Sequence, residues 1–306
     1  MILCCGEALI DMLPAETRDG APAFLPTPGG AVFNSAVALA RLGTPAGLLT
    51  GLSEDLFGQR LAAALEAAGV DTRLAIRSAR PTTLAFVQVV DGQPRYAFFD
   101  ESSAGRMVDA QDLPALPETV EALLFGGISL ASEPCGSAYE ALMRHAGPRA
   151  TLLDPNIRPG LIGHEAAYRM RLDRMIALAD VVKLSDEDLR WLLGDGDPAE
   201  QARGLLARGP KLVLLTSGAG GATAFTARHE VSAPAQRVKV VDTVGAGGVF
   251  NAGLLTALRE AGALTKPALA DLGEGILRDA LELAQRAAAY SVSHRGAAAP
   301  RREDLT

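Results

Sequence analysis

Short apolar runs alternate with segments of helical periodicity along most of this chain. The apolar runs lie at 46–51, 122–125, 151–153, 181–183 and 212–216. Helical spacing of apolar residues is found between them, near 56–68, 134–146, 165–178, 185–193 and 198–208. Continuous apolar runs are typical of strands buried on both faces, and parallel strands need long crossover connections. The alternation therefore predicts a doubly wound α/β fold, a mostly parallel sheet with helices on both faces.

Two segments interrupt this alternation. Residues 82–90 and 95–99 flank Asp91-Gly92-Gln93-Pro94, a pattern that predicts a β-hairpin. Residues 14–28 are rich in Pro, Gly and Ala, and we expect extended lid strands there. We predict a single domain over 1–306 with a small β-lid inserted at about 12–27 and 80–106. Such a lid would exclude water during group transfer, and its exposed strands favour a homodimer paired through the lid.

Composition narrows the class of partner. The 306 residues carry a net charge of -7, with 48% hydrophobic and 21% charged residues. This balance disfavours nucleic acid and anionic membrane surfaces, and no apolar run is long enough to span a membrane. The first residues lack the basic region of a signal peptide, and the three cysteines make no disulfide framework. We expect a cytoplasmic protein that acts on small molecules.

The stretch from 238 to 258 predicts a binding site for an anion. Residues 238–241 are β-branched or extended in character and predict a strand, and residues 249–258 have helical spacing. Between them lies a turn of small residues, Gly245–Gly248, which we call the glycine turn. A strand, a tight turn and a helix aim backbone N–H groups and the positive helix end at one point, where a phosphate fits.

Polar residues recur where the predicted strands end. Asp11, Asp154, Lys183, Thr216 and Asp242 all lie at or near such ends. Ligands of doubly wound sheets bind at the carboxyl ends of the strands, so these residues are candidates for one shared site. The chain has no Gly-Lys-Ser/Thr and no Rossmann fingerprint, which argues against a Walker-type phosphate loop and an NAD-dependent enzyme.

Several motifs together resemble a known family. Asp242-Thr243-Val244-Gly245-Ala246-Gly247 resembles the C-terminal signature of the ribokinase-like (PfkB) carbohydrate kinases. The segments 6–11, 29–34, 154–158 and 183–188 are similar to further motifs of its fructokinase branch, so the resemblance covers nearly the whole chain. It implies a ribokinase-like fold and ATP-dependent phosphorylation of a primary hydroxyl of a sugar, most closely fructose. It also implies Mg²⁺, and it suggests a monovalent cation such as K⁺ near 291–296.

The resemblance also implies residue roles. The acceptor sugar would be held by Asp11, Gly29, Gly30, Asn34, Asn156 and Arg158. The nucleotide side would comprise Lys183, Thr216, Gly218, Gly220, Asp242 and Thr243. The backbone of Gly245, Ala246, Gly247 and Gly248 would hold the transferring phosphoryl group. Glu187 would help to place the metal, although Ser185 followed by three acids is equally typical of an ordinary helix N-cap.

One position departs from the family pattern. Where the family has the Asp that acts as general base, this chain has Gly248. Glycine cannot accept a proton, so we expect a protein that binds ATP and sugar but turns over very slowly. Whether the glycine is natural or introduced is left open by the sequence.

Three alternatives to a fructokinase remain open. Two are kinases for 2-keto-3-deoxygluconate or a riboside, and the third is a non-catalytic protein that binds sugar or nucleotide. The segment 98–106 and the Asp-Pro-Asn-x-Arg motif at 154–158 favour fructose. A keto-acid acceptor needs a further cation facing its carboxylate, and the sequence does not place one.

Overall fold

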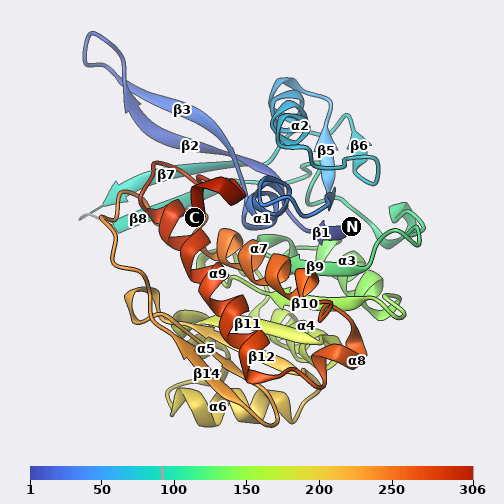
Figure 1. Ribbon diagram of the computed structural model, residues 1–306. Helices are drawn as coiled ribbons and strands as arrows, with labels where there is room; N and C mark the ends of the chain where they lie inside the picture. Colours follow the sequence, from blue (N-terminus) through green and yellow to red (C-terminus); the bar gives the residue numbers. More distant parts are fainter. Residues whose placement is uncertain (91–92, 306) are drawn as a thin grey trace.

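The computed structural model describes residues 1–90 and 93–305, and it contains one large sheet and one small one (Figure 1). The strands of the large sheet are β1 (Ile2–Cys5), β4 (Ala46–Leu49), β9 (Ala122–Gly126), β10 (Ala150–Asp154), β11 (Val181–Ser185), β12 (Leu212–Thr216), β13 (Ala222–Phe225) and β14 (Glu230–Ala233). Their order is β14-β13-β12-β11-β10-β9-β1-β4. The six strands from β4 to β12 are parallel, and β13 and β14 add an antiparallel edge.

Helices cover both faces of this sheet, as the alternation predicts. One face is covered by α1 (Ala31–Arg41), α2 (Leu56–Ala68), α7 (Ala246–Glu260) and α9 (Glu274–Val292), with α8 (Lys266–Leu269) beside them. The other is covered by α3 (Cys135–Arg144), α4 (Glu165–Leu178), α5 (Asp186–Leu193) and α6 (Pro198–Leu206). Neighbouring residues of β1 face opposite layers, because Ile2 packs into the first and Leu3 into the second. The predicted doubly wound α/β class is confirmed.

The small sheet forms a lid over one end of the large one. Its strands are β2 (Leu9–Glu16), β3 (Pro22–Gly29), β7 (Leu84–Val90) and β8 (Gln93–Phe99), in the order β3-β2-β7-β8. Figure 1 shows the β2–β3 hairpin reaching away from the body of the molecule. The predicted turn at Asp91-Gly92 lies outside the described residues. A two-stranded sheet of β5 (Gly51–Ser53) and β6 (Ile76–Ser78) lies beside α2.

One predicted strand is wrong. Residues 238–241 form no strand, and Val238, Val240 and Val241 are 40%, 60% and 47% exposed. Within the described residues, the backbone hydrogen bonds at the end of this stretch join Val241 N and Asp242 N to the carbonyl of Val292, so the β-branched run is tied to the end of α9 and pairs with no strand.

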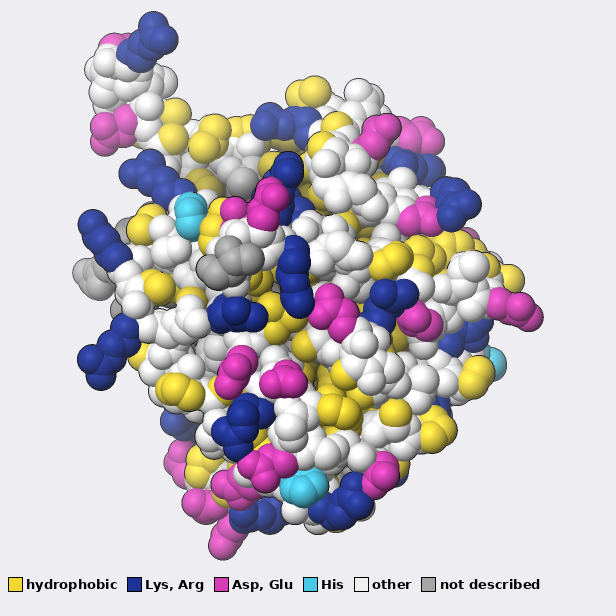
Figure 2. Space-filling view, viewed as in Figure 1, with side chains coloured by type: hydrophobic (Ala, Val, Ile, Leu, Met, Phe, Trp, Pro, Cys, Tyr) yellow, Lys and Arg dark blue, Asp and Glu magenta, His cyan; other side chains and the backbone are white. Residues whose placement is uncertain are grey.

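Charged side chains of both signs are mixed on one face of the molecule (Figure 2). Figure 2 shows positive and negative side chains interspersed over one face of the molecule, without a continuous basic patch on that face. No helix in the described residues is both long and apolar enough to cross a bilayer.

Candidate active site

The glycine turn opens α7 with free backbone donors. Gly245 has φ +81°, and a Cβ atom there would lie 2.3 Å from Ala297 Cβ, so both conformation and space require glycine. No side chain caps the helix. The N–H groups of Gly245, Gly247 and Gly248 make no hydrogen bond within residues 1–90 and 93–305, and that of Ala246 makes a long one, 3.4 Å, to Thr243 O. Free donors at the positive end of a 15-residue helix are suited to an anion.

A buried lysine lies against this turn. The Nζ atom of Lys183, a residue 5% exposed, is 3.4 Å from the place of a Cβ on Gly247. Asp154 Oδ2 accepts hydrogen bonds from Lys183 Nζ at 3.3 Å and from Asn251 Nδ2 at 2.7 Å. The ammonium group therefore adds a held positive charge beside the free N–H groups. Asn251, one turn along α7, was not predicted, and an amide among apolar helix residues was the available signal.

The acceptor side is assembled by two glycines. A Cβ on Gly29 would lie 2.2 Å from Asp11 Oδ2, and one on Gly30, with φ +111°, would lie 2.9 Å from Glu7 O. Because neither glycine has a Cβ atom, β2 and the start of α1 can pack closely together. Asn34 Nδ2, on the first turns of α1, lies 3.3 Å from the place of a Cβ on Gly245. The predicted acceptor residues of α1 thus face the glycine turn.

Glu7 is a site residue that the sequence did not reveal. Its carboxylate, only 6% exposed, accepts hydrogen bonds from Ala31 N at 2.8 Å and from Ser129 Oγ at 3.1 Å. It thereby caps α1 from the loop between β1 and β2 and fixes the loop after β9. Burial raises the pKa of Glu7, although these hydrogen bonds oppose the shift.

Asp11 shares an electrostatic environment with the residues around the turn. Burial, followed by the charges of Glu7 and Asp242, raises the pKa of Asp11 to about 6. Burial also raises the pKa of Tyr96 on β8, and the next contributions come from Asp11, which raises it, and Arg158, which lowers it. The lid tyrosine therefore lies over the same region as Asp11, Arg158 and Asp242.

Asp242 holds two loops together. Its Oδ1 accepts from Val244 N at 3.0 Å, and its Oδ2 accepts from Gly296 N at 2.9 Å. Both oxygens are engaged by backbone donors, so Asp242 positions the glycine turn against the C-terminal loop and does not replace the missing base. Thr243 is exposed beside it.

The loop after β10 is anchored through α5. Asn156 has φ +42°, and Asp188 Oδ1 accepts from Ile157 N at 2.7 Å. The other oxygen of Asp188 completes a capping box with Ser185. Arg158 is exposed, and its recorded hydrogen bond is to its neighbour's carbonyl, Ile157 O.

Glu187 stands apart from the residues that the structure brings together. It is exposed on the first turn of α5 and makes no interaction among the described residues, whereas Asp188 next to it is 3% exposed. The alternative prediction for this segment, an ordinary helix N-cap, therefore holds for Ser185 and Asp188. The spacing to Ser185, three residues as in a capping box, could have indicated Asp188.

The nucleotide-side segment follows β12. Thr216 pairs in register with Ser185, which places it at the same sheet edge as the start of α5. Gly218 and Gly220 lie in the exposed 3₁₀ turn η4 (Gly218–Gly220), and Ser217 Oγ donates to Asp186 Oδ1 at 2.7 Å. Thr216 therefore lies on the strand next to that of Lys183, whose ammonium group lies against the glycine turn.

Comparisons with known proteins show the family of this chain. Residues 1–304 match the pfkB family of carbohydrate kinases. The fructokinase of Rhizobium leguminosarum bv. trifolii is 50% identical over 280 residues, 91% of this chain and 86% of the relative. The chain belongs to the PfkB family of carbohydrate kinases.

Solved structures of this family have the same fold. The ATP-bound fructokinase of Xylella fastidiosa superimposes with a TM-score of 0.90 at 30% identity, covering 99% of this chain and 96% of that one. The fructokinase of Vibrio cholerae O395, with fructose, ADP and a calcium ion bound, has a TM-score of 0.84 at 27% identity, covering 99% and 97%. The ribokinase-like fold is confirmed.

Proposed function

We propose that this chain binds ATP and fructose, and that the reaction of its site is the transfer of the γ-phosphoryl group to the primary hydroxyl that yields fructose 6-phosphate. The observation that carries the proposal is the set of free N–H groups at 245, 247 and 248 between Lys183 and Asn34. The half-identical fructokinase from Rhizobium and the neighbours bound to ATP or to fructose support the same substrates.

Each group of site residues has its own role in this proposal. Asp11 and Asn34 accept and donate hydrogen bonds to the sugar hydroxyls, with Gly29 and Gly30 allowing close approach and Asn156 and Arg158 closing the far side. The glycine turn and Lys183 stabilise negative charge on the transferring group, which is the main demand of phosphoryl transfer. The bond between the γ-phosphorus and the oxygen that bridges it to the β-phosphorus breaks, ADP leaves, and the sugar oxygen bonds to the γ-phosphorus. The hydroxyl proton passes to water, because position 248 carries no base. Lys183, Thr216, Gly218, Gly220, Asp242 and Thr243 line the nucleotide side.

A metal ion fits this site as a companion of the nucleotide. The described residues contain no cluster of three or more His, Cys, Asp or Glu suited to hold a metal. Mg²⁺ commonly keeps its waters and binds phosphates with one or two carboxylates. Asp154 Oδ1 is buried without a hydrogen-bond partner and suits a metal-bound water. The ion would neutralise phosphate charge. For K⁺, the Asp242 carboxylate between two loops is a candidate ligand.

Gly248 accounts for the expected loss of turnover. A Cβ at this position would lie 2.8 Å from Ala31 O and 3.0 Å from Ser35 Oγ, so a side chain there leaves α7 toward the acceptor helix α1. A carboxylate on that path could reach an acceptor hydroxyl. Glycine supplies none, and a positioned base contributes roughly 10²–10⁴ in rate.

A non-catalytic binding protein is the second candidate. The close approach of α1 to Gly248 favours it, because α1 has packed against the glycine where the family has a carboxylate. Both candidates bind sugar and nucleotide, and turnover separates them.

Calorimetric titration tests the binding that both share. We expect this chain to bind Mg·ATP and, with nucleotide present, fructose, and to show no heat with NAD. Lys183→Met should weaken ATP binding because it removes the cation beside the glycine turn. The matched control is Lys266→Met, which breaks another Lys–Asp pair, to Asp180 at 2.9 Å. Equal ATP affinity in all three proteins would contradict the proposed phosphate site.

Assembly and compartment complete the proposal. Phe86 contacts both Phe24 and Phe99 on one lid face, with Phe24 49% and Phe99 62% exposed. Asp11 pairs with Ala85, next to Phe86, so this aromatic face is turned away from Asp11. We propose that it pairs two copies as a homodimer.

The cysteines bear on the cellular compartment. Three buried free cysteines, at 4, 5 and 135, suit the reducing cytoplasm.

A further inference from the structure

A cavity of about 420 Å³ lies between the end of the lid and α4. Its size is within the usual range of small-molecule sites. Its polar and charged lining residues are Asp100, Arg106, Ser132, Glu133, His164, Tyr168 and Arg171. Phe98, Ile128 and Leu161 contribute apolar walls. None of these was given a role in phosphoryl transfer.

The walls of this cavity continue from the acceptor residues. Asp11 pairs with Ala85 and Ala85 with Phe98, so Asp11 and Phe98 share one face of the lid. Ile128 follows Gly127, where a Cβ would lie 2.1 Å from the Glu7 carboxylate oxygens. Leu161 ends η3 (Pro159–Leu161), the turn that follows Arg158. The cavity is therefore a continuation of the acceptor side, remote from the glycine turn.

The Tyr168 hydroxyl is free of hydrogen bonds at this cavity. Tyr168 is 2% exposed as a residue and lines the cavity, and its hydroxyl makes no hydrogen bond within the described part of the chain. Its ring is held 5.8 Å from that of Trp191. The fixed ring thus presents a hydroxyl with unused hydrogen-bonding capacity, which a ligand could use.

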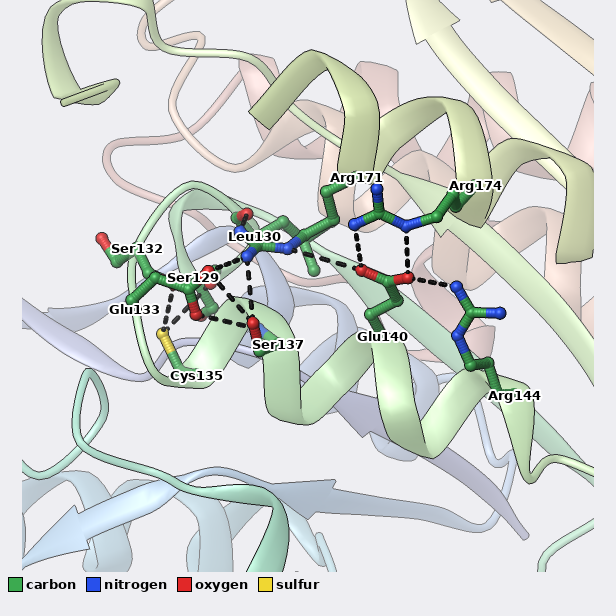
Figure 3. A network of polar contacts seen from close by, with 10 residues as sticks. All are labelled: Ser129, Leu130, Ser132, Glu133, Cys135, Ser137, Glu140, Arg144, Arg171 and Arg174. Carbon is green, nitrogen blue, oxygen red and sulfur yellow. Dashed lines mark hydrogen bonds and ion pairs between the residues drawn. The ribbon is translucent and has the colours of Figure 1, made fainter. Parts of the chain in front are cut away.

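The ionised groups of the cavity are already paired. Arg106 lies 3.1 Å from Asp100 Oδ1 and also donates to Glu133 O at 3.3 Å, while Ser132 Oγ donates to Asp100 Oδ2 at 3.5 Å. Figure 3 shows Arg171 held by Leu130 O, Glu133, Ser137 and Glu140. Each lining guanidinium has a carboxylate partner. An anionic ligand would find no unpaired guanidinium in this cavity. The hydroxyls of a neutral ligand would find both hydrogen-bond donors and acceptors.

We propose that this cavity is the distal half of the acceptor site, where Tyr168 and the Asp100–Arg106 pair bind hydroxyls of a neutral sugar, and that Asp100 sets the preference against acidic sugars by occupying Arg106. The inference rests on the proposed sugar-kinase function and names its substrate class. Specificity is a difference between two affinities, so removing the charge of Asp100 should free Arg106 for a carboxylate.

The test compares fructose with 2-keto-3-deoxygluconate by calorimetry with nucleotide present, and by kcat/KM in the Gly248→Asp background. Asp100→Asn should raise the ratio of acid to fructose by about tenfold or more. Tyr168→Phe keeps the ring and should weaken fructose binding by about fivefold or more, with kcat nearly unchanged. The control is Asp173→Asn, which removes the same charge from a surface pair with Arg208 and should leave both quantities unchanged.

The outcomes distinguish a failure of the proposed distal site from a failure of the proposed function. If the starting protein binds fructose but Asp100→Asn leaves the ratio unchanged, the role of Asp100 is overturned. Unchanged fructose affinity in Tyr168→Phe, which does not depend on how Asp100→Asn folds, would overturn the distal site. If the starting protein binds neither sugar, the proposed function itself is wrong.

Discussion

At the residue scale, the acceptor side depends on two carboxylates in unfavourable surroundings. Asp11 and Glu7 both have raised pKa values, with burial as the main cause in each. The Asp11 carboxylate makes no hydrogen bond within the described residues that would offset this cost. A sugar hydroxyl donating to Asp11 would supply one, so ligand binding and the charge of Asp11 should be linked.

This linkage predicts opposite pH trends for stability and binding. The pKa of Asp11 is about 6 in the folded protein against 3.8 for the unperturbed group, so its contribution to stability is present below 3.8 and is lost as pH rises through about 6. The ligand-free protein should therefore lose melting temperature between about pH 4 and about pH 7 from this group, while fructose affinity should increase. The measurement is Tm and calorimetric Kd across this range.

Asp11→Asn provides the control for that experiment. It removes the titrating group, so the melting temperature should fall less over the same pH range, and fructose should bind weakly at every pH. Identical pH profiles in the two proteins would contradict the role of Asp11.

Residues contributed by tertiary packing could not be predicted from the sequence. Glu7, Tyr96, Asn251 and Asp188 matter because strands or helices distant in sequence place them beside the site. The chain neighbours of Glu7 and Tyr96 gave no pattern for this, whereas Asn251 and Asp188 left only a weak local signal. By contrast, Asp154, Lys183 and Thr216 lie at or near the carboxyl ends of parallel strands, where the order of elements already implied a common edge. Asp11 lies instead within the lid strand β2.

At the element scale, the sequence predicts the helix α7 correctly. It does not predict the conformation of the segment that leads into this helix. The expected strand at 238–241 is an exposed extended segment whose end is bonded to Val292 O of α9 and not to the open edge of β14. The turn is positioned by Asp242 and by Ala297 of the C-terminal loop. The residue pattern shows whether a segment can form a strand and carries no information on whether it joins a sheet.

The two ends of α7 offer a matched pair of substitutions. Gly245 and Gly262 both have positive φ, +81° and +67°, but only Gly245 would clash, since a Cβ on Gly262 meets nothing within 4 Å. Gly262→Ala should cost about 1–2 kcal/mol from the backbone conformation alone. Gly245→Ala should cost more and should also weaken ATP binding, because the turn must move away from Ala297.

Urea unfolding and ATP calorimetry of both variants check this prediction. Equal losses of stability would show that contact with Ala297 is unimportant. Undiminished ATP affinity in Gly245→Ala would argue against the turn as the phosphate site.

At the scale of the whole molecule, the lid separates a sugar-facing surface from an aromatic one. The register of β2, β7 and β8 puts Asp11 and Phe98 on one face and Phe86 and Phe99 on the other. Exposed aromatic residues in contact with one another suit a protein interface. The assignment of side chains to the two faces follows from the register of the strands. The sequence predicts a hairpin here but does not give this register.

A double substitution tests the proposed homodimer. Phe24→Ser with Phe99→Ser should shift the mass measured by light scattering from dimer to monomer, because both exposed rings of the aromatic face are lost. Leu25→Ser is the control, since Leu25 is 57% exposed on the opposite face of β3 and should leave the mass unchanged. A parent that is monomeric at all concentrations would contradict the interface.

The central claim is that the glycine turn holds a transferring phosphoryl group and lacks only a proton acceptor. Steady-state turnover of fructose by Gly248→Asp, Gly248→Ala and the parent tests it most directly. Both substitutions add a Cβ that would lie 2.8 Å from the backbone oxygen of Ala31, so both require the same shift of α1 and Gly248→Ala isolates the carboxylate. We predict that Gly248→Asp exceeds the other two by roughly 10²–10⁴. Parent turnover within about tenfold of Gly248→Asp would contradict the account.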